Sequence, residues 1–193
     1  MLLKLRGGGA VDGKALGAEG DRIANDWLVS QLLAHRPDDG LLSEERLCDG
    51  ARLGHRRVWI VDPLDGTREY SERRDDWAVH VALAIDGVAC VGAVALPGLG
   101  AVLRSDRPGA LPASGEPLRF VVSRTRPPAE AVAIAERLGA TLIPMGSAGA
   151  KAMAIVRGEA DVYLHSGGQY EWDSCAPVAV ALAHGLHASR IDG

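Results

Sequence analysis

The stretch Val58–Thr67, with the sequence VWIVDPLDGT, decides the fold of this chain. The apolar run 58–61 predicts a buried strand, and two carboxylates and a hydroxyl follow at its end, where active sites commonly lie in layered α/β structures. Asp62 and Asp65 are separated by a turn that Pro63 stiffens, and like charges so close repel unless a metal or a proton neutralises them. Gly66 lets a ligand approach the backbone beside the Thr67 hydroxyl. These residues suit metal-assisted phosphate chemistry.

Composition narrows the class of protein. The chain of 193 residues can bury a sizeable core, as one large domain or two small halves. Its net charge of −4 and the lack of a long basic run argue against a nucleic-acid polymer as partner. No apolar stretch reaches the roughly 20 residues that span a bilayer, so no membrane partner is expected.

The cysteines predict a reducing compartment. Cys48, Cys90 and Cys175 lie far apart in sequence and show no CxxC spacing. They are therefore interpreted as reduced thiols of a cytoplasmic protein rather than as a disulfide frame or a zinc site. Cys175 follows Asp173 by two residues, but no motif of a cysteine enzyme surrounds it.

The first half of the chain predicts a sheet with flanking helix. Apolar spacing over 21–33 indicates a helix that Asp21 opens, and 2–5 could be the tail of another helix. Residues 68–76 are charged and are expected to form a loop. Strands are predicted at 41–43, 58–61, 77–85, 88–96 and 101–104, the last three as an antiparallel meander.

The second half alternates strands with helices, which implies a sheet covered by helices. The Pro/Gly/Ser-rich segment 108–117 is the expected boundary between an α+β metal-binding half, 1–113, and an α/β substrate-recognition half, 114–193. Strands are predicted at 118–122, 142–143, 160–164 and 186–188, and helices at 129–138, 150–156 and 174–183.

Acidic side chains recur at the ends of these elements. Glu44 and Glu45 end one strand, Asp62 and Asp65 end the next, and Asp173 precedes the helix led by Ser174. Hard cations such as Mg²⁺ take oxygen ligands of this kind. Each motif alone has another interpretation: the glutamates as solvated surface, Asp21 and Asp173 as helix N-caps, and DPLDGT as a plain turn.

The combination resembles the inositol monophosphatase superfamily of Mg²⁺-dependent, lithium-sensitive phosphatases. The resemblance rests on Leu42-Ser43-Glu44-Glu45, on 59–67, and on Trp172-Asp173 with Ala176-Pro177 downstream. It implies a layered αβαβα sandwich with an antiparallel first half, an active site between the halves, and a homodimer. Members of this family are usually longer, so the sequence is expected to be part of a longer natural chain that continues past 192–193.

The resemblance also implies roles for individual residues. Glu44, Asp62 and the Leu64 carbonyl would bind a first Mg²⁺, and Asp62, Asp65 and Asp173 a second, with a third ion near Glu44. Thr67, supported by Asp21, would position and deprotonate the attacking water. The backbone N–H groups of Gly66 and Thr67 would hold phosphate oxygens if a helix starts there.

The second half is expected to select the substrate. Ser147 opens a helix, and Lys151 stands ten residues before Asp161, similar to family nucleotidases that act on 3′-phosphoadenosine 5′-phosphate. Inositol phosphatases tend to carry Glu where His165 stands. Lys151 and His165 would suit a second phosphate, and 125–128 and 167–173 resemble nucleotidases of sulfate assimilation. The alternatives are an inositol-monophosphate or fructose-1,6-bisphosphate phosphatase, or a non-catalytic sensor of metal or nucleotide.

Overall fold

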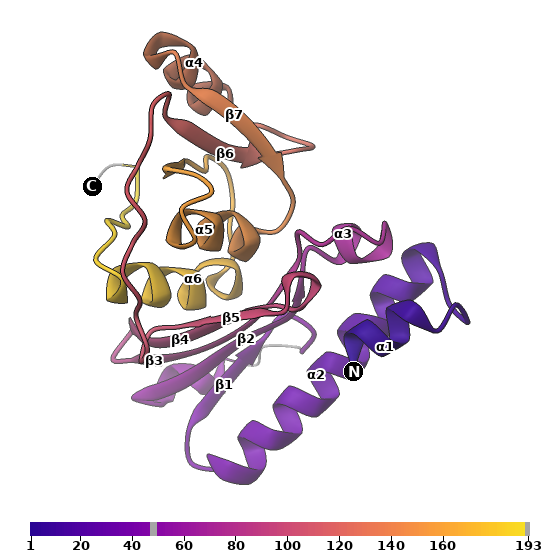
Figure 1. The fold of residues 1–193 in the computed structure, drawn as a ribbon. Helices are drawn as coiled ribbons and strands as arrows, with labels where there is room; N and C mark the ends of the chain where they lie inside the picture. Colours follow the sequence, from indigo (N-terminus) through magenta and orange to yellow (C-terminus); the bar gives the residue numbers. More distant parts are fainter. Residues whose placement is uncertain (47–49, 192–193) are drawn as a thin grey trace.

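Five layers of secondary structure form the computed structural model, which describes residues 1–46 and 50–191 (Figure 1). Helices α1 (Leu2–Gly7) and α2 (Gly13–His35) form one outer layer beside the first sheet. Helices α5 (Ala148–Val156) and α6 (Glu171–Ala183) separate that sheet from a second one, and α4 (Ala129–Leu138) lies outside the second sheet. This αβαβα order is the architecture expected from the sequence.

The first sheet has five strands in the order β1-β2-β3-β4-β5. Neighbouring strands from β2 through β5 pair antiparallel, whereas β1 pairs parallel to β2. The expectation of an antiparallel first half therefore fails at β1. Two short 3₁₀ helices, η1 (Ala51–Gly54) and η2 (Pro97–Leu99), connect strands. The strands are β1 (Gly40–Ser43), β2 (Arg57–Asp65), β3 (Ala78–Ile85), β4 (Val88–Leu96) and β5 (Ala101–Arg104).

The DPLD motif is the irregular end of β2. Asp62 pairs with His80 on β3, but the next pair is Asp65 with Ala78, so the ladder is interrupted between the two aspartates. Pro63 has no N–H to donate and therefore favours such an interruption. A bulged strand end redirects its side chains, and here it carries both carboxylates into one buried place.

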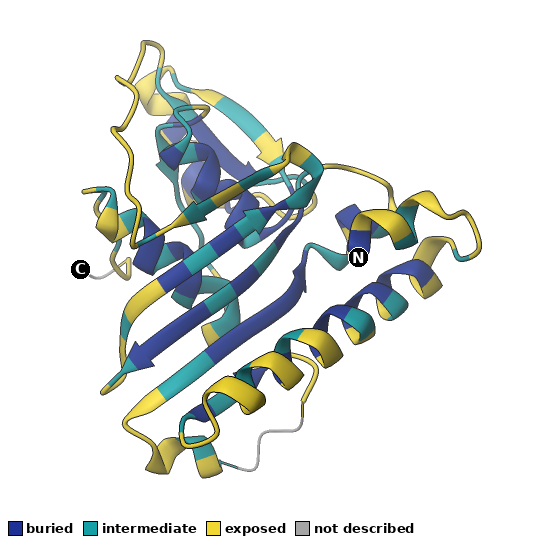
Figure 2. Ribbon diagram, turned by 60° about the horizontal axis from the view of Figure 1, so that its bottom comes forward, coloured by how far each residue is buried: buried dark blue, intermediate teal, exposed yellow. Residues whose placement is uncertain are grey.

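Helices cover both faces of this sheet. The buried side of α2 faces the strands and its exposed side faces solvent (Figure 2). On the opposite face, apolar side chains of α5 and α6 such as Met153 and Val180 share one core with Ile60 and Val94 of the strands. Because this core includes both proposed halves, a domain boundary at 113/114 stays a prediction.

The second sheet is small and parallel, in the order β7-β6-β8. Val121 of β6 is fully buried against Ala154 and Ala160. This sheet and α5 hold the segment in which substrate recognition was predicted. The strands are β6 (Arg119–Ser123), β7 (Thr141–Met145) and β8 (Val162–Tyr163).

Two expectations in the chain's first half are wrong. Helix α2 starts at Gly13, so Asp21 lies inside it and does not open it. Its Gly17 and Gly20 look like breakers, but a side chain there would collide with Ser71 and Tyr70, so close packing explains them. Part of the expected 68–76 loop is helix α3 (Thr67–Ser71). Residues 2–7 form a short helix, in agreement with the helical segment predicted at 2–5.

The chain's end also differs from expectation. Residues 186–188 pair with no strand in either described sheet and are not a strand, and β8 is shorter than the predicted 160–164. Cys90 and Cys175 are free thiols, and Cys48 lies outside the described residues. Across 1–46 and 50–191, no helix is long and apolar enough to cross a membrane.

Candidate active site

Asp62 is the most deeply buried carboxylate at the end of β2. It is 1% exposed, and its Oδ1 accepts a 3.0 Å hydrogen bond from the Leu64 amide. Burial first, and then the charges of Asp65 and Glu44, raise the pKa of Asp62 well above its usual range. A buried charge of this kind needs a compensating partner.

Glu44 and Asp173 converge on Asp62 from other elements. Glu44 follows β1 and hydrogen-bonds the Asp62 side chain, which requires a proton shared between two carboxyl groups. Burial raises the pKa of Glu44, and Glu45, Asp173 and Asp65 raise it further. Burial and the nearby Asp65 charge likewise raise the pKa of Asp173. These acids therefore share one electrostatic environment.

Asp173 lies in the first turn of α6, at its third residue. It is not the N-cap that its position before Ser174 suggested, because α6 begins at Glu171 and Tyr170 is the N-cap. The Asp173 Oδ2 accepts a 2.7 Å hydrogen bond from the Tyr170 amide. This bond fixes the carboxylate and satisfies a free N–H at the helix start.

Asp65 is held by the start of α5. Its Oδ2 accepts from the Ser147 hydroxyl at 2.5 Å and the Gly149 amide at 2.6 Å, and its Oδ1 accepts from the Ala148 amide at 3.1 Å. Burial alone would raise the pKa of Asp65, but His80, Ser147 and the Gly149 amide outweigh it and lower the pKa to about 2. Asp65 therefore stays ionised and joins the end of β2 to the start of α5.

His80 is a fully buried residue that sequence reasoning did not select. Its Nδ1 lies 2.9 Å from the Trp172 carbonyl, and its Nε2 lies 3.1 Å from Asp65 Oδ2. Burial lowers the pKa of His80, but the Asp65 charge outweighs burial and raises it. The imidazole thus links β2 to the start of α6.

Asp21 and Thr67 form the other side of the site. The Thr67 hydroxyl donates a 3.1 Å hydrogen bond to the Leu64 carbonyl, and it lies close enough to the Asp21 carboxylate to lower the pKa of that group. Burial, with the charges of Glu45 and Glu44, raises the pKa of Asp21 to about 7. Asp21, about a third of the way along α2, therefore lies in the same cluster of carboxylates as Glu44 and Glu45.

Two groups of side chains have the ligand spacing of a metal site. The potential ligand atoms of Asp62, Asp65 and His80 lie within 4.8 Å of one another, and so do those of Asp21, Glu44 and Glu45. Buried Asp21, Asp62 and Asp65 beside exposed Glu44 and Glu45 suit hard divalent cations, which would offset the repulsion between these carboxylates.

The family model that matches this chain is "Inositol monophosphatase family", over residues 8–193. The chain belongs to the inositol monophosphatase family. This family is metal-dependent, in keeping with the two acidic groups described above. The family and the fold class predicted from the sequence are thereby confirmed.

Relatives within the inositol monophosphatase family carry nucleotide names. The 3′-phosphoadenosine 5′-phosphate phosphatase of Mycobacterium leprae is 53% identical over 194 residues, covering 93% of this chain and 72% of that protein. Among solved structures, CysQ from Bacteroides thetaiotaomicron superposes with a TM-score of 0.79 at 25% identity, covering 95% of this chain and 81% of that one. A SaIMPase-II structure with bound 2′AMP superposes with a TM-score of 0.75 at 18% identity, covering 95% and 74%.

The predicted substrate residues of this family member lie on two adjoining elements. Gly66, with φ of 87°, is the N-cap of the short helix α3 that Thr67 begins, and a side chain at Gly66 would crowd Ser147. Ser147 is the N-cap of α5 and accepts a 2.9 Å bond from the Ala150 amide. Their roles toward phosphate stay predictions.

Lys151 and His165 lie deeper than their predicted roles suggest. The Lys151 ammonium is 5.3 Å from the centre of the Tyr163 ring and donates to the Ser147 carbonyl at 2.6 Å. His165 is half-buried, its Nε2 has no hydrogen-bond partner in the described chain, and burial and Lys151 lower its pKa. Contact of either side chain with substrate stays a prediction.

Arg124 is another residue that sequence reasoning missed. Its Nε donates to buried Glu69 of α3 at 2.7 Å, and its Nη2 donates to Glu72 at 2.6 Å. The Gly146 amide donates to Asp76 at 2.7 Å beside this pair. Only the alternation of charge in 68–76 hinted at partners for these acids.

Proposed function

We propose that this chain is a Mg²⁺-dependent phosphomonoesterase that removes the 3′-phosphate of 3′-phosphoadenosine 5′-phosphate, giving AMP and phosphate in sulfate assimilation. The observation that carries the proposal is the convergence of Glu44, Asp62 and Asp173 beside Asp65 and Thr67 in a chain 53% identical to a phosphatase of that name. The acidic cluster supports the chemistry and the relative supports the substrate.

The donor set fits divalent metal ions. Burial and the neighbouring carboxylates raise the pKa values of Glu44, Asp62 and Asp173, so divalent cations would replace protons there. Bound Mg²⁺ supplies activation of water and stabilisation of the leaving oxygen. The residues that would hold it are Glu44, Asp62, Asp65, Asp173 and the carbonyl of Leu64.

The chain's own residues then orient the reaction. In the structure the Thr67 hydroxyl donates its single proton to the Leu64 carbonyl at 3.1 Å, with the Asp21 carboxylate beside it. In the reaction this proton turns to Asp21, which leaves the Thr67 oxygen free to accept a hydrogen bond from the attacking water. The water's proton leaves toward this pair as its oxygen attacks phosphorus in line. Asp65 stays ionised and keeps the start of α5 against β2.

The second phosphate is assigned to the Lys151 side of the site. Burial lowers the pKa of Lys151, although the charge of Asp65 and other nearby acids opposes this. A phosphate bound beside the ammonium would favour its charged form further. The unpartnered Nε2 of His165 offers a hydrogen bond in the same region. In the cell we propose a homodimer in the cytoplasm, which analytical ultracentrifugation and fractionation test.

The test measures phosphate release with Mg²⁺ from 3′-phosphoadenosine 5′-phosphate, inositol 1-phosphate and fructose 1,6-bisphosphate. Asp62→Asn is the sharper inactive control than a change at Asp65, because an asparagine oxygen still accepts from the Leu64 amide whereas Asp65 anchors α5. Preference for the nucleotide, lost in Asp62→Asn, supports the proposal. Equal or faster turnover of the other esters overturns the nucleotidase assignment, and metal binding without turnover of any ester indicates a sensor.

A further inference from the structure

Two aromatic rings stack at the start of α6. The rings of Tyr170 and Trp172 have centroids 4.7 Å apart and planes within 12° of parallel. Tyr170 is 65% exposed although one face of its ring lies against Trp172, so the opposite face is open to solvent. Trp172 in turn packs against the main core. The pair is an anchored aromatic platform with one free face.

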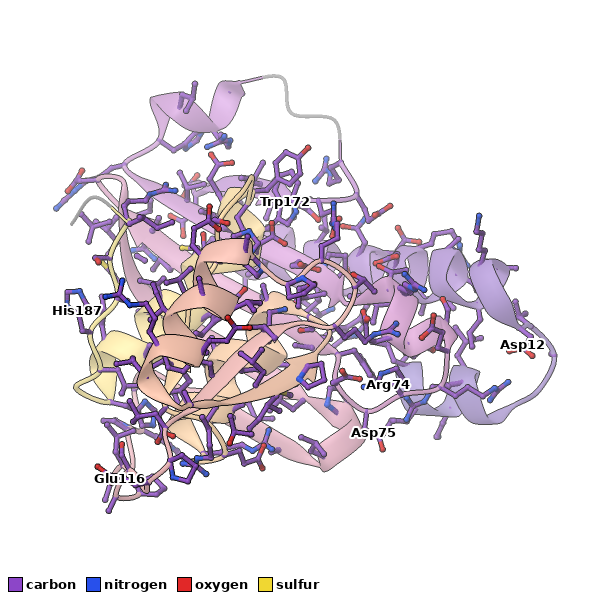
Figure 3. All side chains as sticks on the ribbon, turned by 90° about the horizontal axis from the view of Figure 1, so that it is seen from above. Asp12, Arg74, Asp75, Glu116, Trp172 and His187 are labelled. Carbon is purple, nitrogen blue, oxygen red and sulfur yellow. The ribbon has the colours of Figure 1, made fainter. Side chains whose placement is uncertain are left out.

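The platform is bonded directly to the acidic cluster. The Tyr170 amide donates to Asp173 Oδ2 at 2.7 Å, and the Trp172 carbonyl lies 2.9 Å from His80 Nδ1, whose Nε2 lies 3.1 Å from Asp65. The Arg52–Glu171 ion pair, 2.8 Å, braces the residue between the two rings. Figure 3 shows Trp172 on the side of the molecule away from Glu116 and His187. These contacts fix the position of the platform relative to Asp173 and Asp65.

We infer that the free face of Tyr170 is the stacking site for the purine base of the substrate, an inference that rests on the proposed function. Tyr170 and Asp173 lie within one helical turn, a rise of about 5 Å, and a ribose ring separates a 3′-phosphate from its base by a comparable span. Aromatic side chains hold bases through their π-faces, whatever the base's hydrogen-bonding edge. Esters of inositol or fructose have no base to place there.

A purely structural role would be to shield Trp172 from water. That role requires burial of the inner face of Tyr170 only, and it affects every substrate alike. A stacking role instead affects discrimination between esters with and without a base. Stacking uses the face of the ring and does not need the Tyr170 hydroxyl.

The experiment compares kcat/KM for 3′-phosphoadenosine 5′-phosphate and fructose 1,6-bisphosphate in Tyr170→Ala, Tyr170→Phe and Trp27→Ala. Alanine keeps the amide that Asp173 needs, and Trp27 is a remote aromatic on α2 with similar exposure, 54%. Tyr170→Ala lowers the ratio of the two values about tenfold, or about 1.4 kcal/mol, the scale of stacking one base. Tyr170→Phe and Trp27→Ala keep the ratio. An unchanged ratio in Tyr170→Ala overturns the inference.

A second measurement needs no variant. AMP and ribose 5-phosphate share a sugar and a phosphate but differ in the base, so AMP inhibits the wild-type enzyme at about tenfold lower concentration if the platform binds purine. Equal inhibition overturns the platform. If the wild-type enzyme hydrolyses only sugar or inositol esters, the proposed function fails. Stronger inhibition of that hydrolysis by AMP than by ribose 5-phosphate would still support base stacking on the platform.

Discussion

The hydroxyl of Ser147 donates a 2.5 Å hydrogen bond to Oδ2 of Asp65, joining the bulged end of β2 to the N-cap of α5. The same hydroxyl accepts from the Ala150 amide, so one side chain caps the helix and positions a carboxylate. Ser147 adopts φ of 51°, a left-handed conformation that costs a non-glycine residue energy. The hydrogen bond to Asp65 therefore holds Ser147 in a strained backbone conformation.

Ser147→Ala should lower the free energy of unfolding by about 1–3 kcal/mol, because it removes a cap and leaves a buried acceptor with one partner fewer. Urea denaturation followed by circular dichroism measures this. Ser147→Gly separates the causes, since glycine relieves the strain but also lacks the hydroxyl. Ser30→Ala, on the exposed face of α2, is the matched control. Equal effects of Ser147→Ala and Ser30→Ala would contradict the assignment.

Gly149 gives a steric prediction. A side chain there would overlap the imidazole of His80. Gly149→Ala should therefore displace His80 from Asp65 and reduce phosphatase kcat at least about tenfold, since small misplacements at a site cost that much or more. Gly7→Ala, at the end of α1, meets no atom within 4 Å and should change nothing. Wild-type kcat in a folded Gly149→Ala would show that the His80 contact is dispensable.

Divalent cations should stabilise the protein. Mg²⁺ in about 100-fold excess over its dissociation constant is expected to raise Tm by about 5 to 10 °C. Asp62→Asn should raise Tm without metal, because it removes a buried carboxyl whose pKa burial and its neighbours raise, and should abolish the rise with Mg²⁺. Differential scanning fluorimetry measures both.

Asp26→Asn is the control for this metal experiment. Asp26 is an exposed acid of α2 that pairs with Arg22 and lies outside the two acidic groups. This variant should keep the full response to Mg²⁺. Loss of the response there as well, or its retention in Asp62→Asn, would mean that the cation stabilises the protein elsewhere.

Most strands and helices could be predicted because their apolar residues repeat at the period of the element. The start of α2 could not, since Gly17 and Gly20 look like breakers until their contacts with α3 are known. The 186–188 segment has strand-like composition but no neighbouring strand in the described sheets. Periodicity reports local preference, whereas pairing depends on distant residues.

Glu44, Asp62 and Asp65 were recognisable because they stand at the ends of predicted strands, although their roles as ligands stay predictions. His80 was not recognisable, because its position opposite Asp62 depends on the register of β2 with β3. Asp65 looked like a free ligand, yet four donors surround it. Sequence therefore identified the charges, and only the structure shows which of them the protein itself neutralises.

Arg124 links the second half to α3, and its loss should be costly. Arg124→Met leaves buried Glu69 without its cation, and we expect about 2–4 kcal/mol less stability. Adding Glu69→Gln should recover part of that loss, because the uncompensated charge disappears. The exposed Arg104–Asp106 pair is the control, and Arg104→Met should cost under about 1 kcal/mol. If urea titrations give additive losses for the double variant, Arg124 and Glu69 act independently and the link between α3 and β6 lies elsewhere.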